Sequence, residues 1–110
     1  MTVKIASFNT NSIRARMDII TRWLSDTSTD ILCIQETKVQ DKDFPVEPFE
    51  DINYHCVFKG QKSYNGVAIA SKFPVENVIS GFDGKGDDEG SRLISCKIKN
   101  INIINVYIPQ

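Results

Sequence analysis

Two polar residues, Asn9 and Glu36, come directly after segments that have the character of strands. Residues 3–8 alternate apolar with small or polar side chains, whereas residues 31–34 form an unbroken apolar run. Parallel neighbouring strands bring their carboxyl ends to one edge of a sheet, where open α/β sheets bind ligands. One carboxylate and one amide oxygen form a partial ligand set for Mg²⁺, which takes oxygen ligands and keeps several waters. A turn residue and a surface acid would fit the same pattern, so spacing alone leaves both interpretations open.

A helix between the two strands would make them parallel neighbours. Apolar residues recur over 13–24 at spacings of three and four, and charged residues mostly fall between them. This pattern predicts an amphipathic helix of about four turns, capped by Asn11 or Ser12 and ending near residues 27–29. The strand–helix–strand unit is complete by residue 35, with its strands parallel and its crossover right-handed.

The rest of the chain has mainly the pattern of strands. Residues 39–51 contain Pro45, Pro48 and several acids, which predicts a surface loop with one helical turn. Residues 81–90, rich in glycine and acids, predict a mobile loop whose spacing does not match an EF-hand. Strands are expected at 54–59, 66–72, 75–80, 92–99 and 101–108, the last two forming a hairpin about Lys99 and Asn100.

The composition is that of one soluble globular domain, with 110 residues, 41% of them hydrophobic and 25% charged. A net charge of -1 excludes a globally basic nucleic-acid binder, although a local basic surface remains compatible with it. No apolar run approaches the roughly 20 residues of a membrane span, so we expect no membrane partner. Three cysteines in strand-like runs, without a Cys-x-x-Cys pair, favour reduced thiols and a cytoplasmic location.

Four segments carry a more specific signal. They are SFNTNSIR at 7–14, DILCIQETK at 30–38, YNGVAI at 64–69 and NVYIPQ at 105–110. In this order and spacing they closely resemble exonuclease III and the apurinic/apyrimidinic (AP) endonucleases of the endonuclease/exonuclease/phosphatase superfamily. The resemblance implies a Mg²⁺-dependent DNA-repair phosphodiesterase, with Mn²⁺ as a substitute metal, that acts on double-stranded DNA at abasic sites or 3′ ends. A phosphatase of small molecules is a lesser alternative within the superfamily.

The resemblance also implies roles for individual residues. Glu36 is similar to the family's metal-binding glutamate, Asn9 to an asparagine at the metal and phosphate, and Tyr107 to a tyrosine whose hydroxyl lies by the scissile phosphate. Asn11 stands where some members carry Asp, which removes one carboxylate from the vicinity of the metal. His55 matches no catalytic position. Residues that match DNA-contacting or site-organising positions are Arg14, Lys38, Asn11, Tyr64, Asn65 and Arg92.

We expect an α/β fold with a βαβ start followed by mostly antiparallel strands, one half of a four-layer αββα sandwich of the DNase I-like type. Residues 1–110 match the N-terminal part of the family domain, and the family's Asp-x-Asn segment and Asp-His pair have no counterpart in them. We therefore expect this chain to be inactive alone and its sheet to have one uncovered apolar face. The alternative is a non-catalytic half-domain that self-associates or pairs with a partner half and binds metal or DNA weakly.

Overall fold

The chain begins with the predicted strand–helix–strand unit. In the computed structural model, which describes residues 2–81 and 91–109, β1 spans Ile5–Asn9, α1 spans Ile13–Thr27 and β2 spans Ile31–Gln35. β1 and β2 pair in parallel, with Asn9 opposite Gln35. The predicted order of elements and the parallel pairing are therefore confirmed, and both strands end at the same edge.

The two ends of α1 are fixed in different ways. Ile13, Ile20 and Leu24 form its buried stripe, as the apolar spacing predicts. Ser28 ends the helix in a left-handed conformation and donates its backbone N–H to the Leu24 carbonyl. Ser12 occupies the cap position at the start, but the predicted side-chain cap is wrong, because neither Ser12 nor Asn11 makes it. Backbone carbonyls beyond β2 accept from the first N–H groups of the helix instead.

The segment between β2 and β3 contains more helix than the predicted loop. A short 3₁₀ helix spans Asp41–Asp43, and α2 spans Val46–Asp51. Phe49 is fully buried, and the Phe44 ring stacks on Phe58 with 4.0 Å between centroids. Burial of these rings gives the segment a place in the core that its prolines and acids did not indicate.

The seven strands of the described residues form two sheets. The first has the order β1-β2-β4-β3, with β4 antiparallel to both of its neighbours, and the second has the order β5-β6-β7, all antiparallel. Lys99 and Asn100 join β6 and β7, which confirms the predicted hairpin. The loop predicted at 81–90 lies almost wholly outside the described residues. The new strand bounds are His55–Lys59 for β3, Val67–Ser71 for β4, Glu76–Ser80 for β5, Leu93–Ile98 for β6 and Ile101–Val106 for β7.

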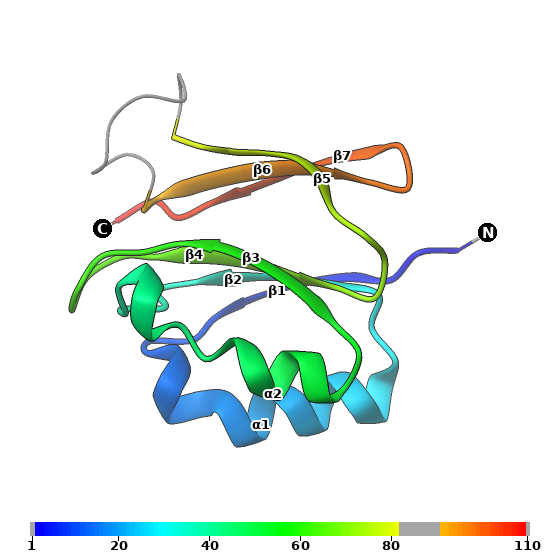
Figure 1. Ribbon diagram of the computed structural model, residues 1–110, viewed down its shortest axis with the longest axis horizontal. Coiled ribbons are helices and arrows are strands. Elements are labelled where there is room, and N and C mark those ends of the chain that lie inside the picture. The colour runs from blue at the N-terminus through cyan, green and yellow to red at the C-terminus, as the bar shows by residue number, and fades with distance from the viewer. Residues whose placement is uncertain (1, 82–90, 110) are drawn as a thin grey trace.

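The elements form three consecutive layers (Figure 1). α1 and α2 cover one face of the first sheet, and the second sheet covers the other face. The expectation of an uncovered face on the first sheet is therefore wrong. Ile94, Cys96 and Ile98 of β6 pack on Cys33 and Ile69 across the interface between the sheets. The predicted α/β fold is confirmed, and this chain supplies the helix–sheet–sheet part of the αββα order.

The outer face of the second sheet carries exposed apolar side chains. Residues alternate in burial along β7, and Ile104 and Val106 point away from the first sheet. Ile79 of β5 pairs with Ser95 on the same face and is half exposed. Within residues 2–81 and 91–109, no helix has the length and apolar character needed to cross a membrane.

Candidate active site

Three chain segments converge at the end of the first sheet where β1 and β2 stop. They are residues 9–13, residues 35–38 and residues 65–66, the last of which lead into β4. Backbone hydrogen bonds join all three, so their relative positions do not depend on charged side chains. These bonds run from the N–H of Thr10 to the Gln35 carbonyl (2.9 Å), Ser12 to Glu36 (2.9 Å), Ile13 to Thr37 (3.1 Å), Thr37 to Gly66 (3.2 Å) and Lys38 to Asn65 (2.9 Å).

The same segments hold an unusual concentration of residues with positive φ. Glu36 has a φ of 54° and Lys38 a φ of 57°, although neither is a glycine. Such conformations cost free energy and persist only where the surroundings impose them, which is common at functional sites. Glycine or asparagine would be the ordinary choice at such positions. The other residues with positive φ here are Asn11, Ser12, Asn65 and Gly66.

Two buried threonines support the strained turn. The Thr10 hydroxyl, 1% exposed, donates to the carbonyls of Gln35 (3.1 Å) and Glu36 (3.0 Å). Thr37 lies against Gly66 so closely that a Cβ added at Gly66 would stand 1.9 Å from its hydroxyl oxygen. The sequence does not single out Thr10 and Thr37, because a threonine in a polar turn resembles any solvated turn residue.

The Glu36 carboxylate is the centre of the polar side chains. Asn9 donates its amide N–H to Glu36 Oε1 at 2.7 Å, and Lys38 Nζ lies 3.6 Å from Oε2. Asn9 Oδ1 accepts the backbone N–H of Asn11, whose own side-chain oxygen accepts from Lys38 Nζ at 2.6 Å. The predicted proximity of Asn9 and Glu36 is confirmed, and the two lie in one connected network with Lys38 and Asn11.

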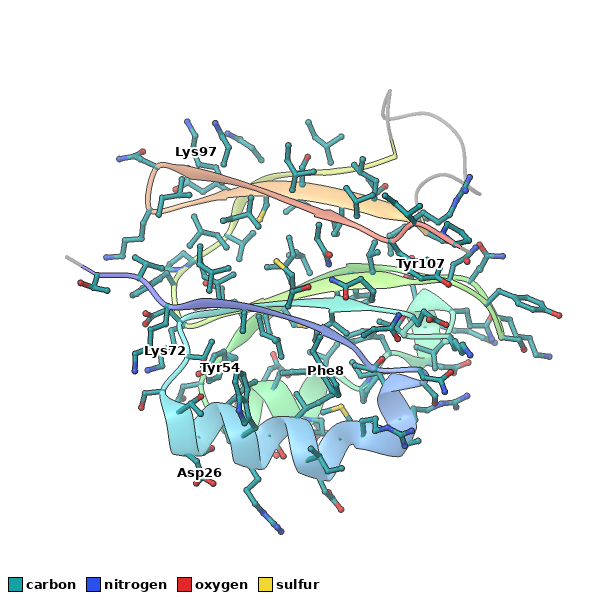
Figure 2. All side chains as sticks on the ribbon, turned by 180° about the vertical axis from the view of Figure 1, so that it is seen from behind. Phe8, Asp26, Tyr54, Lys72, Lys97 and Tyr107 are labelled. Atoms are coloured by element: carbon teal, nitrogen blue, oxygen red, sulfur yellow. The ribbon has the colours of Figure 1, made fainter. Side chains whose placement is uncertain are left out.

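Tyr107 reaches this network from the second sheet. Its backbone N–H donates to the Arg92 carbonyl at 2.8 Å, just beyond the end of β7. Figure 2 shows Tyr107 at the end of the molecule where α1 begins, whereas Lys72 and Lys97 lie at the opposite end. Partial desolvation raises the pKa of Tyr107, and the charge of Glu36 and a hydrogen bond to it add to the effect. The phenol therefore stays neutral beside the carboxylate.

The other predicted site residues are distributed around this centre. Arg14 is exposed in the first turn of α1, and Tyr64 is exposed beside Asn65. The Asn65 backbone accepts from Lys38, and the Arg92 backbone accepts from Tyr107, which ties both to the site. His55, for which no catalytic role is predicted, lies at the start of β3 opposite Ser71, at the other end of the sheet.

A buried pair of amides lies directly behind the network. Gln35 Nε2 donates to Asn105 Oδ1 at 2.7 Å, and Asn105 is 2% exposed between the two sheets. Gln35 and Asn105 fall within the family-like segments 30–38 and 105–110, and neither has a predicted role. The polar Asn105 in an otherwise apolar inward row of β7 was the available signal.

Among the described residues of the site, Glu36 supplies the carboxylate that suits Mg²⁺. Its carboxylate is partly exposed, and Mg²⁺ is commonly held by one or two carboxylates while it keeps several waters. The Asn9 oxygen already accepts from Asn11, so this amide faces the carboxylate with its donor side. Residues 2–81 and 91–109 contain no group of three or more His, Cys, Asp or Glu side chains arranged for a metal.

Comparison with known proteins identifies the family. The family model described as "Endonuclease/Exonuclease/phosphatase family" matches residues 6–108, nearly the whole chain. The chain belongs to this family. An exodeoxyribonuclease of Bacillus subtilis is 34% identical over 98% of the chain and 43% of its own length.

Solved structures of an AP endonuclease and a 3′ phosphatase have the same fold as this chain. An AP endonuclease from Archaeoglobus fulgidus superposes with a TM-score of 0.93 at 49% identity, covering 98% of this chain and 42% of that one. A 3′ phosphatase from Neisseria, bound to a product DNA hairpin, gives 0.89 at 36% identity, covering 96% and 41%. The chain thus spans a little over two fifths of the length of these relatives.

Proposed function

We propose that this chain carries part of the active site of a DNA-repair nuclease that cleaves phosphodiester bonds at abasic sites or 3′ ends in the presence of Mg²⁺. The observation that carries the proposal is the Glu36 carboxylate, held by Asn9 and Lys38 and contacted by Tyr107 where three strand ends meet. Relatives named as an exodeoxyribonuclease, an AP endonuclease and a 3′ phosphatase support this reaction class.

Glu36 is the residue that would hold the metal. Its carboxylate remains partly exposed, while its backbone is fixed by Thr10 and Ser12. A bound Mg²⁺ would neutralise charge on the phosphate oxygens and stabilise the leaving oxygen. The Asn9 amide keeps the carboxylate in one orientation, so the site needs little reorganisation when substrate arrives.

Tyr107 and Lys38 would act on the phosphate itself. The Tyr107 hydroxyl is protonated at neutral pH, and its raised pKa keeps it so; on binding it would turn from Glu36 to donate its one proton to a phosphate oxygen. The Lys38 ammonium lies between Asn11 and Glu36. From there it could contact an oxygen of a phosphate bound next to the Glu36 carboxylate. Arg14, Tyr64, Asn65 and Arg92 would contact flanking phosphates, which position a duplex without reading its sequence.

The test is cleavage of a duplex that carries one abasic-site analogue, with Mg²⁺ and then with EDTA. Two proteins are compared: the 110-residue chain, and a chimera in which it replaces the matching segment of the Archaeoglobus fulgidus AP endonuclease. We expect cleavage by the chimera with Mg²⁺ only. The isolated chain is expected to be inactive, because we propose that the general base lies in the part of the family domain that it does not span.

Matched variants of the chimera separate the site from the fold. Tyr107→Phe removes only the phenolic oxygen and should lower the cleavage rate, whereas Tyr54→Phe alters a tyrosine buried under the helices and should not. A folded chimera that is inactive with Mg²⁺ would contradict the proposal. Cleavage that survives EDTA would contradict its metal dependence.

A further inference from the structure

A hydrogen-bonded bridge of two buried side chains crosses the interface between the sheets behind the site. Asn105 of β7 is 2% exposed, and Gln35 at the end of β2 is 9% exposed. Gln35 Nε2 donates to Asn105 Oδ1 at 2.7 Å and to the Ser7 hydroxyl at 3.0 Å. The bridge therefore extends from β7 through β2 to β1.

The hydrogen-bond partners of Asn105 fix the orientation of its side-chain amide. Its Nδ2 donates to the carbonyls of Ile34 (2.9 Å) and Ala68 (2.8 Å), while its Oδ1 accepts from Gln35. An aspartate in the same place would set an oxygen against two carbonyl oxygens, and an aliphatic residue would leave Gln35 without this acceptor. The hydrogen bonds at position 105 therefore require an asparagine side chain in this orientation, whereas packing alone would also accept an apolar side chain.

The bridge joins the two residues of the site that come from different sheets. Gln35 immediately precedes Glu36, whose φ is positive, and Asn105 lies two residues before Tyr107. Thr10 fixes the Glu36 backbone from within the first sheet, and Arg92 fixes the Tyr107 backbone from within the second. Neither contact relates one sheet to the other, whereas the hydrogen bonds of the Asn105 side chain to Gln35, Ile34 and Ala68 do.

We propose that Asn105 is a positioning residue, which holds Tyr107 in register with Glu36 through its side-chain hydrogen bonds to Gln35, Ile34 and Ala68. The catalytic importance of this register rests on the proposed function, but the register itself is a property of the chain. A separate backbone connection between the sheets at this end runs from the Gly66 N–H to the Ser91 carbonyl at 2.7 Å. It holds the backbone before β6, so loss of Asn105 should loosen the Tyr107–Glu36 contact without separating the sheets.

The test measures that contact by a double-mutant cycle in tyrosine-labelled protein. The ring carbon shift of Tyr107, assigned with Tyr54→Phe and Tyr64→Phe variants, is recorded with and without Glu36→Gln. In the unaltered chain this substitution should move the Tyr107 resonance. In the Asn105→Ala background it should lose most of its effect, because the two side chains are no longer held together.

Two variants serve as controls in the same cycle. Asn102→Ala changes an exposed asparagine of the same strand, and Ser7→Ala removes the other acceptor of Gln35 while it keeps the bond to Asn105. Both should preserve the effect of Glu36→Gln on Tyr107. A folded Asn105→Ala chain with an undiminished effect would overturn the proposal, since a merely structural role predicts that outcome.

A second variant covers the case in which Asn105→Ala does not fold. Of the hydrogen bonds of Asn105, Gln35→Met removes only the one to Oδ1 and leaves both donors on the Ile34 and Ala68 carbonyls, so the effect of Glu36→Gln on Tyr107 should fall, though by less than in Asn105→Ala. In the unaltered chain, the side-chain amide hydrogens of Gln35 and Asn105 should exchange far more slowly than those of Asn102. Exchange at the Asn102 rate would overturn the proposal. Neither measurement uses DNA, so inactivity of the chimera would count against the proposed function alone.

Discussion

The two ends of the first sheet treat their polar groups in opposite ways. At the end away from the site, charged side chains form hydrogen bonds with backbone groups. Asp30 accepts the Lys4 N–H at 2.8 Å, and Lys72 donates to the Ser28 carbonyl at 3.1 Å. At the site end, backbone groups and the buried Thr10 satisfy most of the turns and Asn9 accepts one N–H from Asn11, while the side chains of Glu36 and Lys38 contact only other side chains among the described residues. The site end therefore leaves its charged side chains available for a ligand, at the expense of several positive φ angles.

The largest expected effect comes from removing the charge at the centre of the site. In the chimera, Glu36→Gln should lower the rate of abasic-duplex cleavage by on the order of 100-fold or more, because the metal and the oriented carboxylate are lost together. Asp30→Asn is the matched change at the other end, where the carboxylate serves only the backbone of Lys4. It should leave the cleavage rate unchanged. Equal losses in the two variants would remove the distinction between the ends.

Gly66→Ala tests the strain at the site end. The new Cβ would stand 1.9 Å from the Thr37 hydroxyl at a φ of 98°, so we expect the free energy of unfolding to fall by about 3 kcal/mol. Urea unfolding of the 110-residue chain measures this loss. Combining Gly66→Ala with Thr37→Ala removes the clash with the hydroxyl and should restore part of the stability, leaving the cost of the positive φ and of tight contacts with the Cβ of residue 37 (3.1 Å) and the Lys38 backbone nitrogen (3.2 Å). A stable Gly66→Ala chain would show that the turn is not so tightly packed.

The interface between the sheets should respond to alkaline pH through its thiols. Burial, together with the nearby Cys96, raises the pKa of Cys33 from 9.0 to about 11. The unfolded thiol ionises first, so its stabilising contribution is complete below pH 9 and is lost as the pH rises toward 11. Urea midpoints at pH 7.5, 9 and 10.5 should fall more steeply for the unaltered chain than for Cys33→Ala. Parallel pH dependence in the two proteins would contradict a buried Cys33.

The smallest expected effect lies in the hairpin of the second sheet, away from the site. Lys99 and Asn100 have φ values of 52° and 65°, the geometry that favours glycine at the second position of a two-residue turn. Asn100→Gly should raise the free energy of unfolding by a few tenths of a kcal/mol and leave cleavage by the chimera unchanged. A clear loss of stability would mean that the Asn100 side chain has a role in the turn.

Local sequence patterns were sufficient to predict most helices and strands and the proximity of Asn9 to Glu36. The apolar spacing of α1 and the alternation of the strands are short-range signals, and parallel pairing of β1 with β2 brings Asn9 to Glu36. The single helical turn predicted within 39–51 understated the helix there, because Pro45 and Pro48 outweighed the burial of Phe44 and Phe49. Burial of those rings depends on sheet strands that follow later in the chain.

Long-range relations account for the remaining errors and omissions. Alternation along β6 and β7 shows that each has an apolar face, but not that this face covers the first sheet. Thr10 and Asn105 act on backbone carbonyls 25 to 71 residues away, and backbone groups have no sequence signature. The positive φ of Glu36 could not be predicted from the sequence either, because it is imposed by hydrogen bonds from other segments.

The metal-holding role that we propose for Glu36 can be examined by anomalous diffraction from crystals of the chimera soaked in Mn²⁺, compared with crystals of its Glu36→Gln variant. We expect an anomalous peak beside the Glu36 carboxylate, close to Asn9, that is absent from the variant. A Mn²⁺ peak elsewhere in the molecule that is unaffected by Glu36→Gln, with no density at the carboxylate, would contradict it.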